Sequence, residues 1–431
     1  MTPRPLLSAA CALGLALPAA AVAGQVGHAA PAVSAAATVA APARTQPAAA
    51  SSTMEVAISR TLNAASKSQY LGAGLSGYVV DSGTGEVIWS RNVSRTRMPA
   101  STQKVITAYV ALRTLHPRAQ IITKTVQSQS NPGNVYLVGA GDPTLTKARL
   151  VSLASRTAQA LAAQGRTSVN LYLDDTVFPR PTLAQGWKGD YLSSDVQLVR
   201  GLTMAGYRGK DGAVAAGTVV KAEFVKRGIT VGEFSRGTAP ETRDVLAESW
   251  SPTIAAILSS MLNYSNNDYA EYLLRLSAQR AGEPTTWAGA LGHARSVLAQ
   301  GDITTTGYVA RDGSGLSRSN RMPVRTLVDT VAKLHANPTD RAIVFARGAL
   351  PRAGQTGTLA SRYKSTAQRC AVGKVIAKTG TLNDVVGLAG VAEGVDGRDR
   401  IFAFLENGNR KTAAVRNAVD TLATTAVGCR L

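Results

Sequence analysis

Three short polar motifs follow one another along the 431 residues, and together they constrain the fold more than any other feature of the sequence. They are S-T-Q-K at Ser101–Lys104, S-N-N at Ser265–Asn267 and K-T-G-T at Lys378–Thr381. Each motif alone is a weak signal, because short polar runs also form helix caps and loops. The ordered set is a strong signal, and a chain that uses all three motifs must bring these distant segments to one cleft.

The first motif places a nucleophile and a base one helical turn apart. From Thr102 onward apolar residues recur at three- and four-residue spacing, so Ser101 begins a predicted helix and Lys104 lies on the same face. A serine hydroxyl is a poor nucleophile until a neighbouring base takes its proton. We predict that burial and a second cation, Lys378, lower the pKa of Lys104 enough for this role. The free backbone N–H at the helix start supplies half of an oxyanion hole; an ordinary helix cap is the alternative.

The second motif lies between two predicted helical segments, where its polar residues favour a turn. On a continuous helix Ser265 and Asn267 would point to different sides, whereas a loop lets both side chains enter one cleft. We expect Ser265 to relay a proton to a leaving amine and Asn267 to hold a substrate amide. A polar loop with no catalytic role is the alternative.

The third motif ends a predicted strand. Gly380 leaves room for a peptide backbone to approach the strand. Lys378 and Thr379 are expected to bind a terminal carboxylate, and the Thr381 N–H to complete the oxyanion hole. The alternative is an exposed strand end.

Strands at both ends of the chain predict the fold class. One hairpin is expected over 75–80 and 86–89, and another over 385–392 and 401–405, where an Asp-Gly turn joins the strands. Helical patterns occupy much of the sequence between them. We therefore predict an α/β (α+β) fold, with an antiparallel sheet flanked by helices on both faces and an inserted smaller α/β domain.

The chain divides into consecutive predicted segments. A charged start, an apolar stretch and an A-x-A cleavage site are typical of a secretory signal peptide, and the run is short for the alternative, a membrane anchor. An Ala- and Pro-rich tether follows. The predicted segments are the signal peptide at 1–23, the tether at 24–52, the catalytic domain at 53–122 and 249–431, and the inserted domain at 123–248. Within the insert we expect strands at 134–138, 169–173 and 219–225 and a helix at 150–164.

Composition indicates the kind of partner. The formal net charge of +20 suits an anionic polymer. For an exported chain we expect that polymer in the cell wall, and a basic but solvated surface is the alternative. Aromatic residues make up only 5% and are not interleaved with basic runs, so no nucleic-acid partner is expected. After the signal peptide no stretch reaches the ~18 apolar residues of a transmembrane helix.

Cysteine and histidine usage bears on the compartment and on metals. Cys370 and Cys429 remain after the signal is removed, and in an oxidising compartment they are a candidate disulfide. Two buried thiols are the alternative. The four histidines are scattered and no H-E-x-x-H motif occurs, so we predict neither a metal site nor a cofactor.

Longer segments around the motifs resemble one known family, the D-alanyl-D-alanine carboxypeptidases of the class C low-molecular-mass penicillin-binding proteins (peptidase family S13, penicillin-binding protein 4 type). The second motif reads S-N-N where S-D-N is common in that family, and the insert is shorter than in many members. The matching segments are P-A-S-T-Q-K at Pro99–Lys104, L-V-G-A-G-D-P-T-L at Leu137–Leu145, D-G-S-G-L-S at Asp312–Ser317 and A-K-T-G-T-L at Ala377–Leu382.

The resemblance implies the penicilloyl-serine-transferase fold and hydrolysis of the terminal D-Ala–D-Ala bond of peptidoglycan stem peptides in the cell wall or outside the cell. It also implies that β-lactams acylate the active serine as covalent inhibitors. By motif match, Ser101 is the nucleophile, Lys104 the base, Ser265 and Asn267 the second motif, and Lys378–Thr381 the third.

Other activities stay open at this point. The enzyme could trim stem peptides, cut cross-links as an endopeptidase, or do both. A secreted serine β-lactamase would share the motifs but needs a deacylating group, and Glu283 is not followed by the asparagine that class A enzymes place nearby. A cell-wall-binding protein with a weak catalytic site is a further alternative.

Overall fold

The computed structural model describes residues 53–429 and 431, and it contains two five-stranded sheets. The predicted signal peptide at 1–23 and tether at 24–52 lie outside the described residues. Within 53–429, no helix is both long and apolar enough to cross a membrane.

The first sheet combines strands from both ends of the chain. Every neighbouring pair in it is antiparallel, and β1 pairs with β10 from Leu75↔Glu406 to Asp81↔Arg400. The antiparallel sheet predicted from the two terminal hairpins is therefore confirmed. In spatial order its strands are β2 (Val87–Arg91), β1 (Leu75–Asp81), β10 (Asp399–Asn407), β9 (Val385–Glu393) and β8 (Val375–Leu382).

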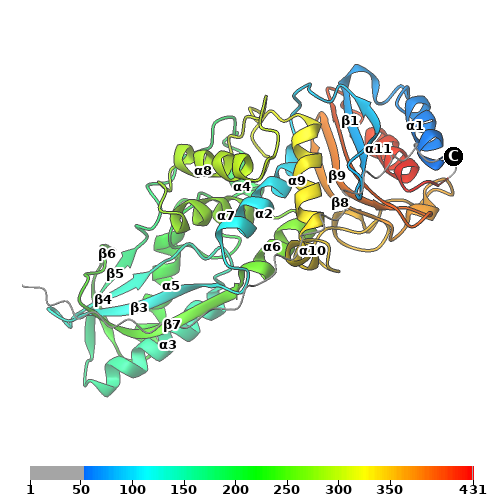
Figure 1. Ribbon diagram of the computed structural model, residues 1–431. Coiled ribbons are helices and arrows are strands. Elements are labelled where there is room, and N and C mark those ends of the chain that lie inside the picture. Colours follow the sequence, from blue (N-terminus) through cyan, green and yellow to red (C-terminus); the bar gives the residue numbers. More distant parts are fainter. Residues whose placement is uncertain (1–52, 430) are drawn as a thin grey trace, which may run out of the picture. The chain divides into compact units, whose positions relative to one another are not determined.

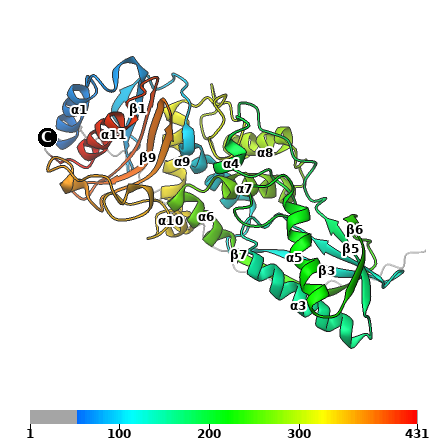
Figure 2. The same cartoon turned by 180° about the vertical axis from the view of Figure 1, so that it is seen from behind.

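Helices cover both faces of this sheet, as predicted (Figures 1 and 2). On one face α1 (Thr53–Ala65) and α11 (Thr412–Ala426) pack against the strands, and on the other face lies α9 (Val324–Ala336). Successive side chains of a strand point to opposite faces, so Leu388 joins the core under α11 while Ala389 joins the core under α9.

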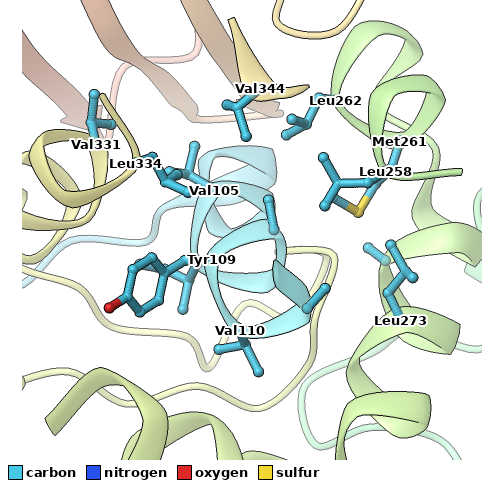
Figure 3. Close-up of a cluster of buried hydrophobic side chains, with 14 of the residues drawn as sticks. Val105, Tyr109, Val110, Leu258, Met261, Leu262, Leu273, Val331, Leu334 and Val344 are labelled. Carbon is cyan, nitrogen blue, oxygen red and sulfur yellow. The ribbon is translucent and has the colours of Figure 1, made fainter. Parts of the chain in front are cut away.

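Helix α2 (Gln103–Thr114) is buried along most of its length and forms the centre of the larger hydrophobic core. Figure 3 shows Val105, Tyr109 and Val110 of α2 pointing outward into side chains of the surrounding helices. Its neighbours hold the first turn, which carries Lys104, in one place. They are α6 (Ile254–Tyr264), α7 (Asn267–Arg280), α8 (Trp287–Gln300) and α9, and beyond α6 and α9 lies α10 (Pro338–Val344).

The second sheet is mixed. The three strands on one side, β4, β5 and β6, run parallel in a β4–α3–β5–α5–β6 succession, and β3 and β7 continue the sheet with antiparallel pairing. This sheet spans 120–253, and contacts group it with the first sheet in one compact unit. In spatial order the strands are β6 (Thr230–Arg236), β5 (Ser168–Asp174), β4 (Asn134–Val138), β3 (Gln120–Ser128) and β7 (Arg243–Thr253), with the helices α3 (Lys147–Ala163) and α5 (Gly212–Lys226) packed on the sheet. The short α4 (Tyr191–Ser194) packs elsewhere, against a small cluster around Trp187 and Leu316.

The strand predicted at 219–225 is wrong, because these residues lie in α5. Asp211 caps this helix by accepting from the N–H groups of Ala213 and Val214. Val220 and Phe224 are four residues apart and completely buried, so the helical spacing prevails over the β-branched composition.

Cys370 and Cys429 form a disulfide with Cα atoms 6.3 Å apart. The bond fastens the segment that precedes β8 to the residues that follow α11. The candidate disulfide is thus present in the structure.

Candidate active site

Ser101 lies in a 3-10 turn, η2 (Ala100–Thr102), directly before α2. Ala100 has a φ of +47°, a left-handed conformation that is unusual for a residue with a Cβ atom. The turn is pressed against Gly315, where a Cβ atom would lie 1.8 Å from the Ala100 carbonyl oxygen. The local backbone strain therefore occurs at the predicted nucleophile and is held there by a glycine from a distant segment.

The Lys104 amine sits among three oxygen atoms. Its Nζ lies 3.1 Å from Ser101 Oγ, 2.7 Å from Asn267 Oδ1 and 2.8 Å from the Ser314 carbonyl oxygen. A neutral amine has two N–H donors and one lone pair. With Asn267 and Ser314 accepting the two donors, the lone pair faces the Ser101 hydroxyl.

The electrostatics favour a neutral lysine. Burial lowers the pKa of Lys104 to about 7, while the carboxylates of Glu271, Asp312 and Asp268 oppose that decrease. Lys378 is completely buried too, and burial and the charge of Lys104 lower its pKa well below the ordinary value. Burial, more than a second cation, is thus the cause of the Lys104 shift.

The second motif forms the predicted loop between α6 and α7. Ser265 ends α6 with a φ of +59° and is half-buried, and Asn266 caps α7 by accepting from the Tyr269 N–H at 3.0 Å. Asn267 binds Lys104, and its Nδ2 donates to the Asp195 carbonyl at 3.0 Å. The middle residue acts as a helix cap, and asparagine and aspartate both serve there. This explains how S-N-N can stand in place of S-D-N.

The third motif lies on β8, which packs against η2. A Cβ atom at Gly380 would come within 2.7 Å of the Pro99 carbonyl, so glycine lets this strand approach the turn of the nucleophile. Lys378 Nζ donates to the Thr379 carbonyl at 3.0 Å, and the Thr379 and Thr358 hydroxyls lie 2.7 Å apart. Thr381, the last residue of the motif, is exposed.

The fold thus joins Ser101, Lys104 and Asn267 by hydrogen bonds and lays the strand of the third motif beside them. The structure gives the Ser265 side chain no direct bond to Ser101 or Lys104. It adds the Ser314 carbonyl, which sequence reasoning missed because any residue supplies the same backbone group. The glycine-rich segment around Ser314 was the available signal, and it was used only for the family resemblance.

Comparisons with known proteins identify the family of this chain. The model of the D-Ala-D-Ala carboxypeptidase 3 (S13) family matches residues 58–204 and 200–426. Carboxypeptidase Rv3627c of Mycobacterium tuberculosis is 33% identical over 376 residues, which is 81% of this chain and 79% of the relative. Carboxypeptidase DacB of Mycolicibacterium smegmatis is 32% identical over 377 residues, which is 82% of this chain and 80% of the relative.

Among solved structures, penicillin-binding protein 4 (dacB) from Haemophilus influenzae has a TM-score of 0.71 at 21% sequence identity. The likeness covers 84% of this chain and 97% of the solved one, and it confirms the predicted fold class. The family predicted from the motifs is confirmed by the matching model and by the two relatives. The chain belongs to the D-Ala-D-Ala carboxypeptidase 3 (S13) family and is a serine-type D-Ala-D-Ala carboxypeptidase, a hydrolase.

Proposed function

We propose that the enzyme cleaves the terminal D-Ala–D-Ala bond of peptidoglycan stem peptides through an acyl-enzyme on Ser101. The observation that carries this proposal is the Lys104 amine, buried and 3.1 Å from the Ser101 hydroxyl. An amine with a pKa near 7 can take the serine proton at neutral pH.

In the acylation step, Ser101 Oγ attacks the carbonyl carbon of the penultimate D-Ala, and its proton passes to the Lys104 amine. The oxyanion of the tetrahedral intermediate accepts hydrogen bonds from the backbone N–H groups of Ser101 and Thr381. The C–N bond then breaks, and the proton held by Lys104 passes through the Ser265 hydroxyl to the leaving D-Ala amine. Water then attacks the resulting ester while Lys104 takes a proton from it. The bond between the acyl carbon and Ser101 Oγ breaks, and Lys104 returns that proton to Ser101 Oγ.

The strand β8 orients the substrate in this scheme. The stem peptide lies along β8 as an added strand, and its terminal carboxylate faces Thr379. Lys378 is completely buried and its Nζ donates to the Thr379 carbonyl, so it positions the residue that meets the carboxylate rather than contacting the carboxylate itself. The Asn267 side chain bridges Lys104 and the Asp195 carbonyl, and in this scheme the same amide also contacts the substrate amide.

β-Lactams are expected to acylate the same serine and to leave slowly. We place the enzyme outside the cytoplasm, because the sequence begins with the pattern of a secretory signal and the stem peptides are found in the cell wall. Its net charge of +20 favours an anionic wall polymer as a second partner.

The first test is mass spectrometry of the purified chain after brief exposure to benzylpenicillin, with Ser101→Ala as the control. A long-lived adduct on the Ser101 peptide, absent in the control, is the expected result. Absence of an adduct together with consumption of the drug would identify a β-lactamase. An intact drug and no adduct would indicate a weak site in a wall-binding protein.

A second assay separates the peptidase activities. Release of free D-Ala from a monomeric stem peptide measures carboxypeptidase activity, and conversion of a cross-linked dimer to monomers measures endopeptidase activity. The proposal requires carboxypeptidase activity. The endopeptidase reaction, measured in the wild type and in Ser101→Ala, shows whether the same serine performs both reactions.

A further inference from the structure

The loop that carries Ser314 is fastened between α2 and α7 through a single peptide group. The Gly313 carbonyl accepts from the Thr107 hydroxyl of α2 at 2.6 Å, and the Ser314 N–H donates to Glu271 Oε1 of α7 at 2.7 Å. The Gly313 N–H donates to the other carboxyl oxygen, Oε2, at 2.9 Å. Glu271 therefore holds two consecutive N–H groups of the loop with its two oxygens.

The next peptide group connects the lysine to a second acid. Its carbonyl, that of Ser314, accepts from Lys104, and its N–H, that of Gly315, donates to Asp312 Oδ1 at 3.0 Å. Hydrogen bonds that share a peptide group polarise one another. The peptide is thus polarised by a negative charge on the side away from the lysine.

Both acids are completely buried, and neither touches Lys104 directly. Burial and Asp312 raise the pKa of Glu271, while its bonds to Ser314 and Gly313 oppose the rise. Both carboxyl oxygens accept from a backbone N–H, which is the bonding pattern of the ionised form. The ammonium form of Lys104 favours the carboxylate in turn, because opposite charges stabilise one another. The other charged groups that bear on this cluster are Asp268 and Arg275 on α7 and Lys378 on β8.

We propose that Glu271 is a positioning residue for acylation, which fixes the Ser314 carbonyl against Lys104 and places a negative charge behind the amine. The inference rests on the proposed role of Lys104 as the base. Burial alone would make that amine too weak a base, and the charge of Glu271 opposes this effect. Glu271 also follows Asn267 by four residues, so one face of α7 carries both the ligand of the lysine and its counter-charge.

The test compares the rate of acylation by benzylpenicillin between pH 5 and pH 9 in the wild type and three variants. Glu271→Gln removes the charge at nearly constant size. We expect its rate profile to shift to lower pH by about one unit and its plateau to fall roughly tenfold. Glu271→Asp keeps the charge but shortens the side chain, so it should keep the wild-type midpoint at a lower plateau.

Thr107→Val is the matched control, because it removes a bond to the same loop without changing any charge. It should lower the rate at every pH and leave the midpoint in place. An unshifted midpoint in Glu271→Gln, or an equal shift in Thr107→Val, would overturn the proposal. If Glu271→Gln does not fold, a shifted midpoint in Glu271→Asp overturns it and an unshifted one supports it.

Failure of the underlying function has a different signature. In that case the wild type itself would form no adduct on Ser101 at any pH. If the wild type is acylated and Glu271→Gln has the same pH midpoint for acylation, the role of Glu271 is refuted and the role of Ser101 stands.

Discussion

The two sheets of the molecule differ in how many of their faces are covered by helices. In the first sheet the interior strands are buried on both faces, so β9 and β10 are almost continuously inaccessible. In the second sheet α3 and α5 cover one face, and buried and more accessible residues alternate along β4 and β5 (Figure 2). A sheet packed on both sides allows little movement, and the sheet that carries the third motif is of this kind.

The open face of the second sheet is held by polar and aromatic contacts. Tyr136 and Tyr172 stack with ring centroids 5.0 Å apart, and the Tyr172 hydroxyl donates to Glu233 at 2.7 Å. Lys124 and Glu248 form an ion pair at 3.0 Å on this sheet. Such surface contacts contribute little each, so this region tolerates changes that the first sheet does not.

The largest expected contrast between the two regions is that between two lysines. Lys104→Ala removes the base and should slow acylation by benzylpenicillin at least about a thousandfold. Lys124 lies in the second sheet, so the Lys124→Ala variant should be acylated at the wild-type rate. The adduct on the Ser101 peptide, followed by mass spectrometry, measures both variants; a comparable loss in Lys124→Ala would remove the distinction between the regions.

The next effect is that of pH on the intact enzyme. In the proposed mechanism the neutral Lys104 amine is the base, and its fraction rises as pH rises through the Lys104 pKa of about 7. Acylation should therefore be roughly a hundredfold slower at pH 5 than on its plateau above pH 8. Stopped-flow rates between pH 5 and pH 9 test this expectation, and a flat profile would contradict it.

Truncating a core leucine in either sheet should lower the free energy of unfolding by a similar amount, whereas only the truncation in the first sheet should slow acylation. Leu388 on β9 and Leu171 on β5 are both completely buried, so each Leu→Ala change should lower the free energy of unfolding by about 3 kcal/mol. Leu388 pairs with Thr379 of the third motif, so its truncation should also slow acylation several-fold.

Urea titrations monitored by circular dichroism measure the stability of both leucine variants. Acylation of folded Leu171→Ala should match the wild type. A separate early transition in Leu171→Ala would show that residues 123–248 unfold as an independent domain, as the sequence predicts. Equal loss of acylation rate in both variants would contradict the comparison.

The smallest expected effect is that of the exposed ion pair. Glu248→Ala should lower the free energy of unfolding by less than about 1 kcal/mol, because both partners are about a third exposed. By contrast, Asp420→Ala removes the carboxylate that pairs with the buried Arg362 guanidinium beneath the first sheet. This change should lower the free energy of unfolding by about 3 kcal/mol. Chemical denaturation of the two variants in parallel measures the difference.

The sequence predicted most of the catalytic constellation, because the groups concerned are side chains in recognisable order. Ser101, Lys104 and Asn267 meet as expected, and the loop of the second motif was predicted from its turn-forming residues. The Ser314 carbonyl escaped prediction, since its position depends on how a distant loop packs against α2. Glu271 was not predicted either, because a carboxylate in a helix is ordinarily a surface group and its burial depends on tertiary packing.

The fold was predicted where local pattern and tertiary packing agree. The terminal hairpins have short apolar runs joined by turn signals, and both exist. Residues 219–225 combine β-branched composition with helical spacing, and packing against the second sheet selects the helix. Helices α8, α9 and α10 were not predicted, and the first two pack against α2.

The pairing of β1 with β10 has a consequence for the timing of folding. More than three hundred residues separate Leu75 from its partner Glu406, so the sheet has a high contact order and closes slowly. Ribosomes release the C-terminal strand last. A nascent chain therefore carries Ser101 and Lys104 long before it has the strand that completes the sheet.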